Sequence, residues 1–144
     1  MGSTALKQNG SIIIKYKKRF TNPLVLAETA NQGLDAKDFF SVSVLTGFEQ
    51  EILAGILNTS VKTFTRYRKS RKKLSPSNSE QLLKILVMYE AGKEVFGSYE
   101  SFKKWLEKPA YGLGNKIPLN LLSTSTGIDL VIDEIKRIAY GDLA

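Results

Sequence analysis

Seven basic side chains fall within twelve residues near the middle of the chain, and no acidic residue lies among them. They are Lys62, Arg66, Arg68, Lys69, Arg71, Lys72 and Lys73. Lys and Arg donate charge-assisted hydrogen bonds to phosphate oxygens, so this run predicts salt-sensitive binding to a polyanion such as DNA. A charge run by itself is equally typical of a solvated helix in an ordinary bundle.

The spacing of apolar residues around the basic run favours the first interpretation. Residues 50–69 fit two short helices joined by a tight turn. Apolar or small residues occupy the positions where these helices would touch: Leu53, Ala54, Leu57 and Phe64. Asn58 falls in the turn and tolerates the left-handed backbone that such a turn needs. Ser60 is a typical N-cap for the second helix, so the spacing predicts a helix-turn-helix that reads the major groove of DNA.

A recognition helix contacts base edges mainly through its N-terminal part. The candidates for base contacts are therefore Ser60, Lys62, Thr63 and Arg66, with Thr65 and Lys69 on the same exposed face. The later basic residues, Arg68, Arg71, Lys72 and Lys73, suit contacts with phosphates. We expect a homodimer, because one reader helix rarely gives enough affinity and two-fold operators match two-fold proteins.

Composition argues against most enzyme classes. The chain contains no histidine and no cysteine, which removes the usual general base, the thiolate nucleophile and the commonest zinc ligands. Carboxylates, Lys, Arg and Tyr remain, but their spacing forms no recognisable catalytic arrangement. Gly112 and Gly114 lack the strand and the Gly-Lys-Thr sequence of a phosphate loop. We therefore expect no catalytic residues, no metal site and no cofactor.

Charge divides the chain into two parts. Residues 1–73 carry 13 Lys and Arg against 5 Asp and Glu, a formal charge of +8, whereas residues 74–144 carry 8 against 9, a charge of −1. The basic part suits a polyanion and the near-neutral part suits protein contacts. The apolar runs are too short to span a bilayer and the N-terminus has no secretory segment, so we expect a cytoplasmic protein without a membrane association.

The pattern of caps and breaks predicts an all-α fold in three parts. We expect residues 1–34 to be an arm, residues 35–73 the helix-turn-helix domain, and residues 74–144 a small helical domain. The start of the arm, which contains Lys15, Lys17, Lys18 and Arg19, reads as a short edge strand or a disordered basic tail. It would either seek phosphates or simply aid solubility. Pro23 to Ala30 suggests a turn or two of helix.

Several local signals define the helices of the C-terminal part. A helix restarts near residue 75, either with Ser75 as cap and Pro76 in the first turn or with Ser77 and Glu80 as a capping box. Its apolar residues on most faces predict that it is largely buried. Gly97 should end it, and Ser98 should cap the next helix. Further helix is expected at 118–122 and after a cap at residue 124 or 125, ending at residue 141.

A series of short motifs follows in a definite order along this part of the chain. They are Leu74-Ser75-Pro76, Ala91 to Val95-Phe96-Gly97, Trp105-Leu106, Pro109, Leu113-Gly114, Pro118-Leu119, Leu121-Leu122, Gly127 with Val131, and Arg137-Ile138-x-Tyr140-Gly141. Upstream, Leu53-Ala54 and Ser60-x-x-Thr63-Phe64-x-Arg66 extend the pattern. In this order and spacing, residues 45–144 resemble the Xre/MbcA/ParS family of antitoxins. Ala110, Asn115 and Ile117 depart from the family's usual loop residues, and residues 1–34 lie outside the resemblance.

The resemblance implies an all-helical antitoxin that binds the operator of its own toxin–antitoxin pair and covers a partner toxin with its C-terminal domain. Such toxins resemble ADP-ribosyltransferases of the RES or ParT type, and the adjacent gene is the expected source. The resemblance further implies that the end of the last helix approaches or plugs the toxin's active site. The residues concerned are Lys136, Arg137, Tyr140, Gly141, Asp142, Leu143 and Ala144. A frayed terminus is the competing interpretation of the last residues.

Two other functions compete with that of an antitoxin. One is a stand-alone helix-turn-helix repressor that uses its C-terminal half for dimerisation. The other is a small transferase or hydrolase, for which the absence of histidine and cysteine is a serious obstacle.

Overall fold

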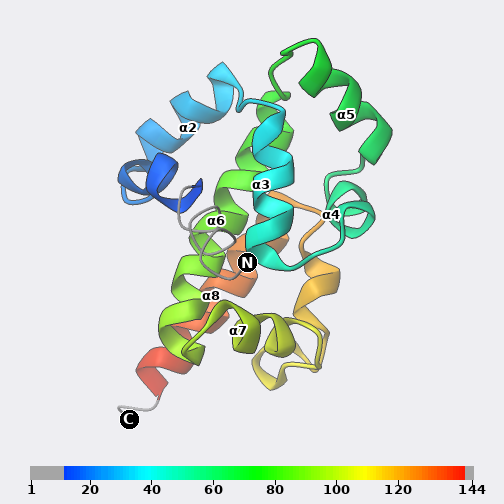
Figure 1. Cartoon of the computed structure of the whole chain (residues 1–144). Coiled ribbons are helices and arrows are strands. Elements are labelled where there is room, and N and C mark those ends of the chain that lie inside the picture. The colour runs from blue at the N-terminus through cyan, green and yellow to red at the C-terminus, as the bar shows by residue number, and fades with distance from the viewer. Residues whose placement is uncertain (1–11, 142–144) are drawn as a thin grey trace.

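The computed structural model describes residues 12–141, which form helices and connecting loops around one long helix (Figure 1). The helices are a short one at residues 12–16, η1 (Lys17–Arg19), α2 (Pro23–Gln32), α3 (Lys37–Thr46), α4 (Gln50–Ile56), α5 (Val61–Lys69), α6 (Pro76–Phe96), α7 (Tyr99–Leu106), η2 (Tyr111–Leu113), η3 (Pro118–Leu121) and α8 (Ser125–Gly141). No β-strand occurs in this range, which confirms the predicted all-α class.

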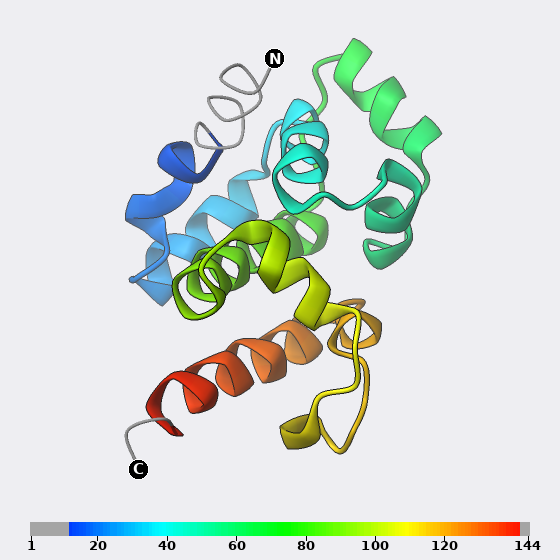
Figure 2. The same ribbon diagram turned by 60° about the horizontal axis from the view of Figure 1, so that its bottom comes forward.

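The long helix α6 runs through the centre of the fold and carries most of its core. Helices α2, α7 and α8 all pack against it (Figures 1 and 2). Its fully buried hydrophobic side chains are Leu82, Leu83, Ile85, Leu86, Met88 and Tyr89. Burying each of the aliphatic ones contributes about 1.5–3 kcal/mol, so α6 is the largest single source of hydrophobic stabilisation.

The predicted helix caps are confirmed where the structure tests them. The Ser75 side chain accepts a hydrogen bond from the Asn78 amide at 3.1 Å, with Pro76 in the first turn, so this cap is chosen over the alternative at residues 77–80. Ser98 caps α7 in the same way, and Thr124 accepts from the Gly127 amide at the start of α8. Gly97 ends α6 with a φ of 92°.

The helices α3, α4 and α5 form a group beside α6, in which α3 contacts α4, α5, α6 and α7 (Figure 1). The buried rings of Phe39 on α3 and Phe64 on α5 stack with centroids 4.0 Å apart. Asn58 has a φ of 54° in the turn between α4 and α5, as its residue type predicts. Among residues 12–141 no single helix is long and apolar enough to cross a membrane. The bent pair α3 and α4 has the necessary length and apolar composition only when the two helices are taken together.

The N-terminal segment corrects the expectation of an edge strand or a disordered tail. Residues 12–16 are helical, and Ile12, Ile13 and Tyr16 are buried in the core. β-Branched residues favour strands only weakly, and here the gain from burying their side chains outweighs that preference. Helix α2 then confirms the turn or two of helix expected from residue 23, with Asn22 as its cap. Residues 1–11 lie outside the described range.

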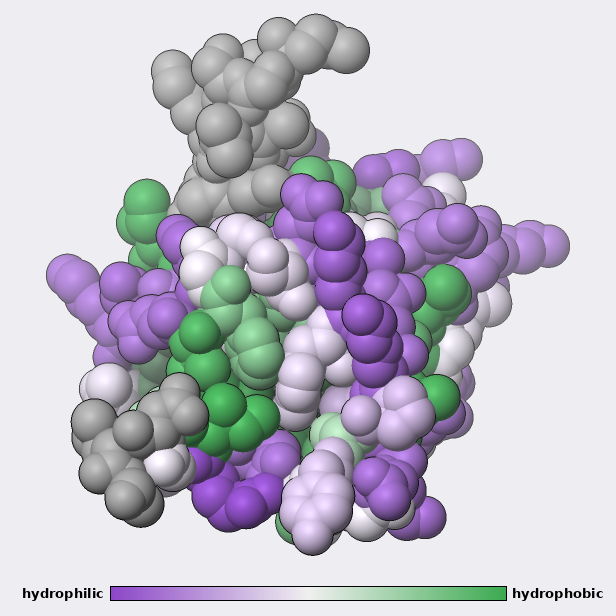
Figure 3. All heavy atoms as spheres, turned by 90° about the horizontal axis from the view of Figure 1, so that it is seen from below, coloured by the Kyte–Doolittle hydropathy of each residue, from purple (hydrophilic) through white to green (hydrophobic). Residues whose placement is uncertain are grey.

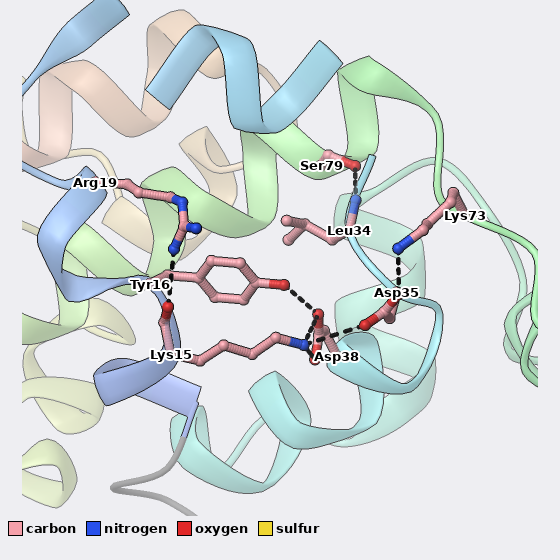
Figure 4. A network of polar contacts seen from close by, with 8 residues as sticks. All are labelled: Lys15, Tyr16, Arg19, Leu34, Asp35, Asp38, Lys73 and Ser79. Carbon is pink, nitrogen blue, oxygen red and sulfur yellow. Dashed lines mark hydrogen bonds and ion pairs between the residues drawn. The ribbon is translucent and has the colours of Figure 1, made fainter. Parts of the chain in front are cut away.

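A polar network ties this segment to α3 (Figure 4). The Tyr16 hydroxyl donates to Oδ2 of Asp38 at 2.5 Å, and Lys15 Nζ contacts both oxygens of the same carboxylate at 3.0 Å. Asp38 is only 2% exposed, so without these donors its charge would be buried and unpaired. Lys15 also reaches Asp35 at 3.2 Å, and Lys73 reaches Asp35 at 2.5 Å.

A short clamp joins the start of α3 to the start of α6. Asp35 and Lys73 form an antiparallel β-bridge, and the Leu74 amide donates to the Leu34 carbonyl at 2.8 Å. The Leu34 amide in turn donates to the buried hydroxyl of Ser79 on α6 at 2.9 Å. Gly33 precedes the clamp with a φ of 86°, and a Cβ there would lie 2.6 Å from the Leu74 carbonyl oxygen. Only glycine allows the two segments to approach this closely.

We expect Gly33→Ala to lower the free energy of unfolding by about 2–4 kcal/mol, because it combines a strained backbone with a clash against a backbone oxygen. Urea unfolding followed by circular dichroism measures the loss. Gly55→Ala is the matched control, since Gly55 is helical and a Cβ there meets nothing within 4 Å. That change should be neutral or stabilising by up to about 1 kcal/mol. Equal effects of the two substitutions would contradict the role given to the clamp.

We expect Tyr16→Phe to destabilise the fold by about 1–3 kcal/mol at neutral pH, because Asp38 loses a buried donor. Burial, and then the hydrogen bond to Asp38, raise the pKa of Tyr16 well above its usual value. A raised pKa means that the stabilisation is complete below the pKa of the unfolded chain, about 10, and is lost as the pH rises above it. The difference in unfolding free energy between wild type and variant should therefore shrink above about pH 10.

The control for this experiment is Tyr140→Phe, because Tyr140 is 70% exposed and makes no buried hydrogen bond in the described structure. Its unfolding free energy should match that of the wild type at neutral pH. A gap between wild type and Tyr16→Phe that stays constant up to pH 11 would contradict the assignment.

Candidate functional site

Helix α5 is fixed in place by contacts on one side and left open on the other. Phe64 is fully buried, while Ser60 caps the helix by accepting from the Thr63 amide at 3.2 Å, as predicted. No acidic residue lies in its first turn, and Arg66, Arg68 and Lys69 lie in its last. The result is a helix that is anchored on one side and basic on its free face.

Four of the predicted DNA contacts share one face of α5. Lys62, Thr65, Arg66 and Lys69, together with Val61, line a shallow hollow of about 380 Å³. Ser60 and Thr63 lie at the N-terminal end of the same helix, where their hydroxyl oxygens are 3.0 Å apart. Their polar atoms already take part in the cap, so they are less free for base contacts than the side chains of Lys62 and Arg66. That these six residues contact DNA stays a prediction.

The four residues predicted to bind phosphates do not all lie in one place. Arg68, Arg71 and Lys72 turn towards the start of α3 and line a second hollow of about 420 Å³ with Lys37. Lys73 instead forms its ion pair with Asp35. The sequence pattern missed Lys37, because it lies on another helix and 25 residues before Lys62. Its isolated position gave no local signal.

The last helix buries one side and exposes the predicted toxin contacts. Gly127, Ile128, Val131, Ile132 and Ile135 form the buried stripe. Lys136, Arg137, Tyr140 and Gly141 are exposed, which leaves them open to a partner. Asp142, Leu143 and Ala144 lie outside the described residues, so their predicted role is untested.

The glycine-containing loop around Gly112 and Gly114 lies beside α8, a contact that the sequence pattern did not predict. Glu134 is only 5% exposed and accepts from Arg137 Nε at 2.7 Å, which holds the guanidinium against the helix. Gly112 packs on this pair so closely that a side chain there would overlap both. Neighbouring Tyr111 is 90% exposed. The only sequence signal for an exposed residue at this position was an aromatic residue next to glycines, and that pattern is too general to indicate a binding surface.

Figure 3 views the molecule from this end, where hydrophobic side chains gather between hydrophilic ones. A mixture of apolar and charged groups, with exposed Tyr and Arg among them, is typical of surfaces that bind proteins. The end of α8 and the α5 face lie at opposite ends of the molecule in both ribbon views (Figures 1 and 2).

Comparison with protein families covers both surfaces. Residues 25–87 match the antitoxin Xre-like helix-turn-helix domain, and residues 91–141 match the antitoxin Xre/MbcA/ParS C-terminal toxin-binding domain. The chain belongs to the Xre/MbcA/ParS family of antitoxins. It is therefore an antitoxin of a toxin–antitoxin system, with a toxin as partner and a helix-turn-helix for DNA binding.

Two relatives of this antitoxin extend the likeness over most of its length. It is 25% identical over 118 residues to an antitoxin Xre from Yersinia enterocolitica, which covers 81% of this chain and 80% of the relative. It is 21% identical over 112 residues to an antitoxin Xre from Photorhabdus laumondii, which covers 77% and 76%. The first domain match ends at residue 87 and the second begins at residue 91, both within α6, and the division of this antitoxin at residues 34 and 73 stays a prediction.

Proposed function

We propose that this antitoxin binds the operator of its own toxin–antitoxin pair through α5 and inhibits an ADP-ribosyltransferase-like toxin through the end of α8. The observation that carries the proposal is the separation of the two surfaces at opposite ends of the fold. Neither surface blocks the other, so DNA and toxin can be bound at the same time.

The case for operator binding rests on the free face of α5. The stacked Phe39 and Phe64 rings hold the helix against α3, so that Lys62 and Arg66 project without disturbing the core. A basic helix anchored in this way suits the major groove, where Arg makes bidentate contacts with guanine. Two copies would present two such helices to a two-fold operator, so we propose that the antitoxin acts as a homodimer.

The case for toxin inhibition rests on exposed side chains around a fixed Arg137. Tyr and Arg are the residues most enriched among those that dominate binding energy in protein interfaces. Tyr111, Arg137 and Tyr140 are exposed at this end, and the Glu134 carboxylate restricts the motion of Arg137 before any partner binds. We further propose that Asp142 and the terminal carboxylate pair with Arg side chains in the toxin that otherwise bind phosphates of NAD.

The toxin proposed here is of the RES or ParT type and is encoded by the adjacent gene. We infer that the antitoxin acts by occupying surfaces and is not itself an enzyme, in the cytoplasm where operator DNA is found. A stand-alone repressor would share the α5 face but would not need a partner at α8, so the toxin experiment below separates the two functions.

For DNA binding we expect Arg66→Ala and Lys62→Ala each to weaken affinity for the promoter of the antitoxin's own gene by about 5–150-fold. Affinity for a random duplex should fall far less, because a base contact contributes only at the correct sequence. Fluorescence anisotropy at fixed salt measures both affinities.

The matched control for the DNA experiment is Lys108→Ala, which removes one exposed positive charge from the loop after α7, outside both hollows beside α5. It should bind both duplexes almost as the wild type does. If Arg66→Ala and Lys108→Ala bound the promoter equally well, α5 would not be the recognition helix.

We expect a deletion and a substitution in the antitoxin each to weaken its inhibition of the toxin encoded by the adjacent gene. Deleting residues 142–144 should restore NAD consumption or target modification by the toxin, because the proposed plug is gone. Tyr111→Ala should weaken toxin binding by about 30-fold or more, the usual loss for a dominant interface aromatic. Calorimetry gives the affinity and NAD turnover gives the inhibition.

Leu24→Ala serves as the control for Tyr111→Ala, because Leu24 is 66% exposed and belongs to α2, which Figure 1 shows well separated from the end of α8. It should leave affinity and inhibition unchanged. Full inhibition by the shortened chain would exclude the plug, and absence of any complex between wild type and toxin would favour the stand-alone repressor.

A further inference from the structure

We propose that the hollow between the start of α3 and the end of α5 is a phosphate-binding site formed by Lys37, Arg68, Arg71 and Lys72. It has a volume of about 420 Å³ and is separate from the hollow on the recognition face of α5. Where its ligand is a phosphate of the DNA backbone, the site rests on the proposed operator binding. The affinity of the site for a free phosphate compound is independent of operator binding.

The site is assembled from two parts of the chain. Lys37 comes from the first turn of α3, whereas Arg68, Arg71 and Lys72 come from the end of α5 and the loop after it. Asp35 is the only acidic residue among the side chains that line the hollow. Four positive charges therefore converge with one negative charge, and the hollow suits a small anion of high charge density.

The single carboxylate is already engaged by cations of its own. Lys73 Nζ lies 2.5 Å from one Asp35 oxygen, and Lys15 Nζ lies 3.2 Å from the other. The hydrogen bond from Lys73 and that from Lys15 hold the pKa of Asp35 below its usual value, so it stays ionised and paired. The four lining cations are consequently left for a ligand.

Aromatic rings hold two of these cations in position, and a left-handed backbone conformation turns the chain at a third. The Arg68 guanidinium lies 4.0 Å from the centroid of the Phe40 ring, and Lys72 Nζ lies 4.4 Å from that of Tyr67. Such cation–π contacts hold the charged groups against the ring faces, and N–H bonds that point away from the rings can still donate to a ligand. Arg71 has a φ of 56°, and the Lys72 amide donates to the Tyr67 carbonyl at 2.8 Å, so the chain turns tightly at the rim.

Phosphate is the ligand chemistry that this arrangement fits best. The planar guanidinium matches two phosphate oxygens at once, and a lysine ammonium adds a point charge. The phosphate could belong to the DNA backbone beside the groove that α5 enters, or to a free phosphorylated molecule. Both share the same recognition by the four cations, and the two arms of the experiment distinguish them.

The first arm titrates the full chain with inorganic pyrophosphate by calorimetry. Lys37→Gln should weaken binding about tenfold, the loss of one charge-assisted hydrogen bond. Asp35→Asn should strengthen it several-fold, because a negative charge leaves the rim. Lys108→Gln, which removes an exposed charge that does not line the hollow, should have no effect. Damage to the fold would weaken pyrophosphate binding in both Lys37→Gln and Asp35→Asn. Weaker binding by the first variant and stronger binding by the second therefore identify a site.

The second arm measures binding of the promoter duplex as a function of salt. Lys37→Gln should reduce the salt slope by about 1 and weaken specific and random duplexes alike, whereas Arg66→Ala acts mainly on the specific duplex. An effect of Lys37→Gln in this arm alone identifies a backbone phosphate, and an effect with pyrophosphate alone identifies a free phosphorylated ligand. Either result supports the site.

The proposal is overturned if Lys37→Gln and Lys108→Gln behave alike in both arms, or if Asp35→Asn weakens pyrophosphate binding as Lys37→Gln does. Failure of the wild type to bind any duplex would refute operator binding but not this site. In that case the pyrophosphate titration decides it alone.

Discussion

The fold depends on the clamp between residues 34–35 and 73–74. The β-bridge and the Leu74 to Leu34 hydrogen bond join the two ends of the segment that contains α3, α4 and α5, and Ser79 anchors the clamp to α6. Without this closure the three short helices would be attached to the core mainly by side-chain packing, and helices of seven to ten residues are not stable alone. The clamp therefore fixes where α5 points.

Helix α6 connects the two functional ends of the antitoxin. The buried amide of Gln81 donates to the Ile56 carbonyl at the end of α4 and to the Ser123 carbonyl just before α8. Lys84, one turn later, pairs with Asp129 on α8 at 2.8 Å. Because these contacts originate on one continuous helix, the position of α8 relative to α4 is set by polar contacts as well as by the apolar core.

Neutralisation of carboxylates is a recurring feature of the basic end. Asp38 is buried and Asp35 lies beside the phosphate hollow, and both would oppose a polyanion if left unpaired. Lys15 and Tyr16 approach them from the N-terminal segment, which precedes the region matched by the helix-turn-helix family model. This segment thus contributes to the electrostatics of the α5 end as well as to the core.

The sequence by itself determined the features that rest on neighbouring residues. The caps at Ser60, Ser75 and Ser98, the left-handed turn at Asn58 and the ordered motifs of the family all depend on a few consecutive side chains. Only the tertiary structure decided that Lys37 joins the cations of α5, that Gly112 covers the Glu134–Arg137 pair, and that residues 12–16 are helical and buried. These features arise from contacts between residues far apart in the chain, where burial and charge pairing outweigh local preference, and no short window of sequence contains both partners.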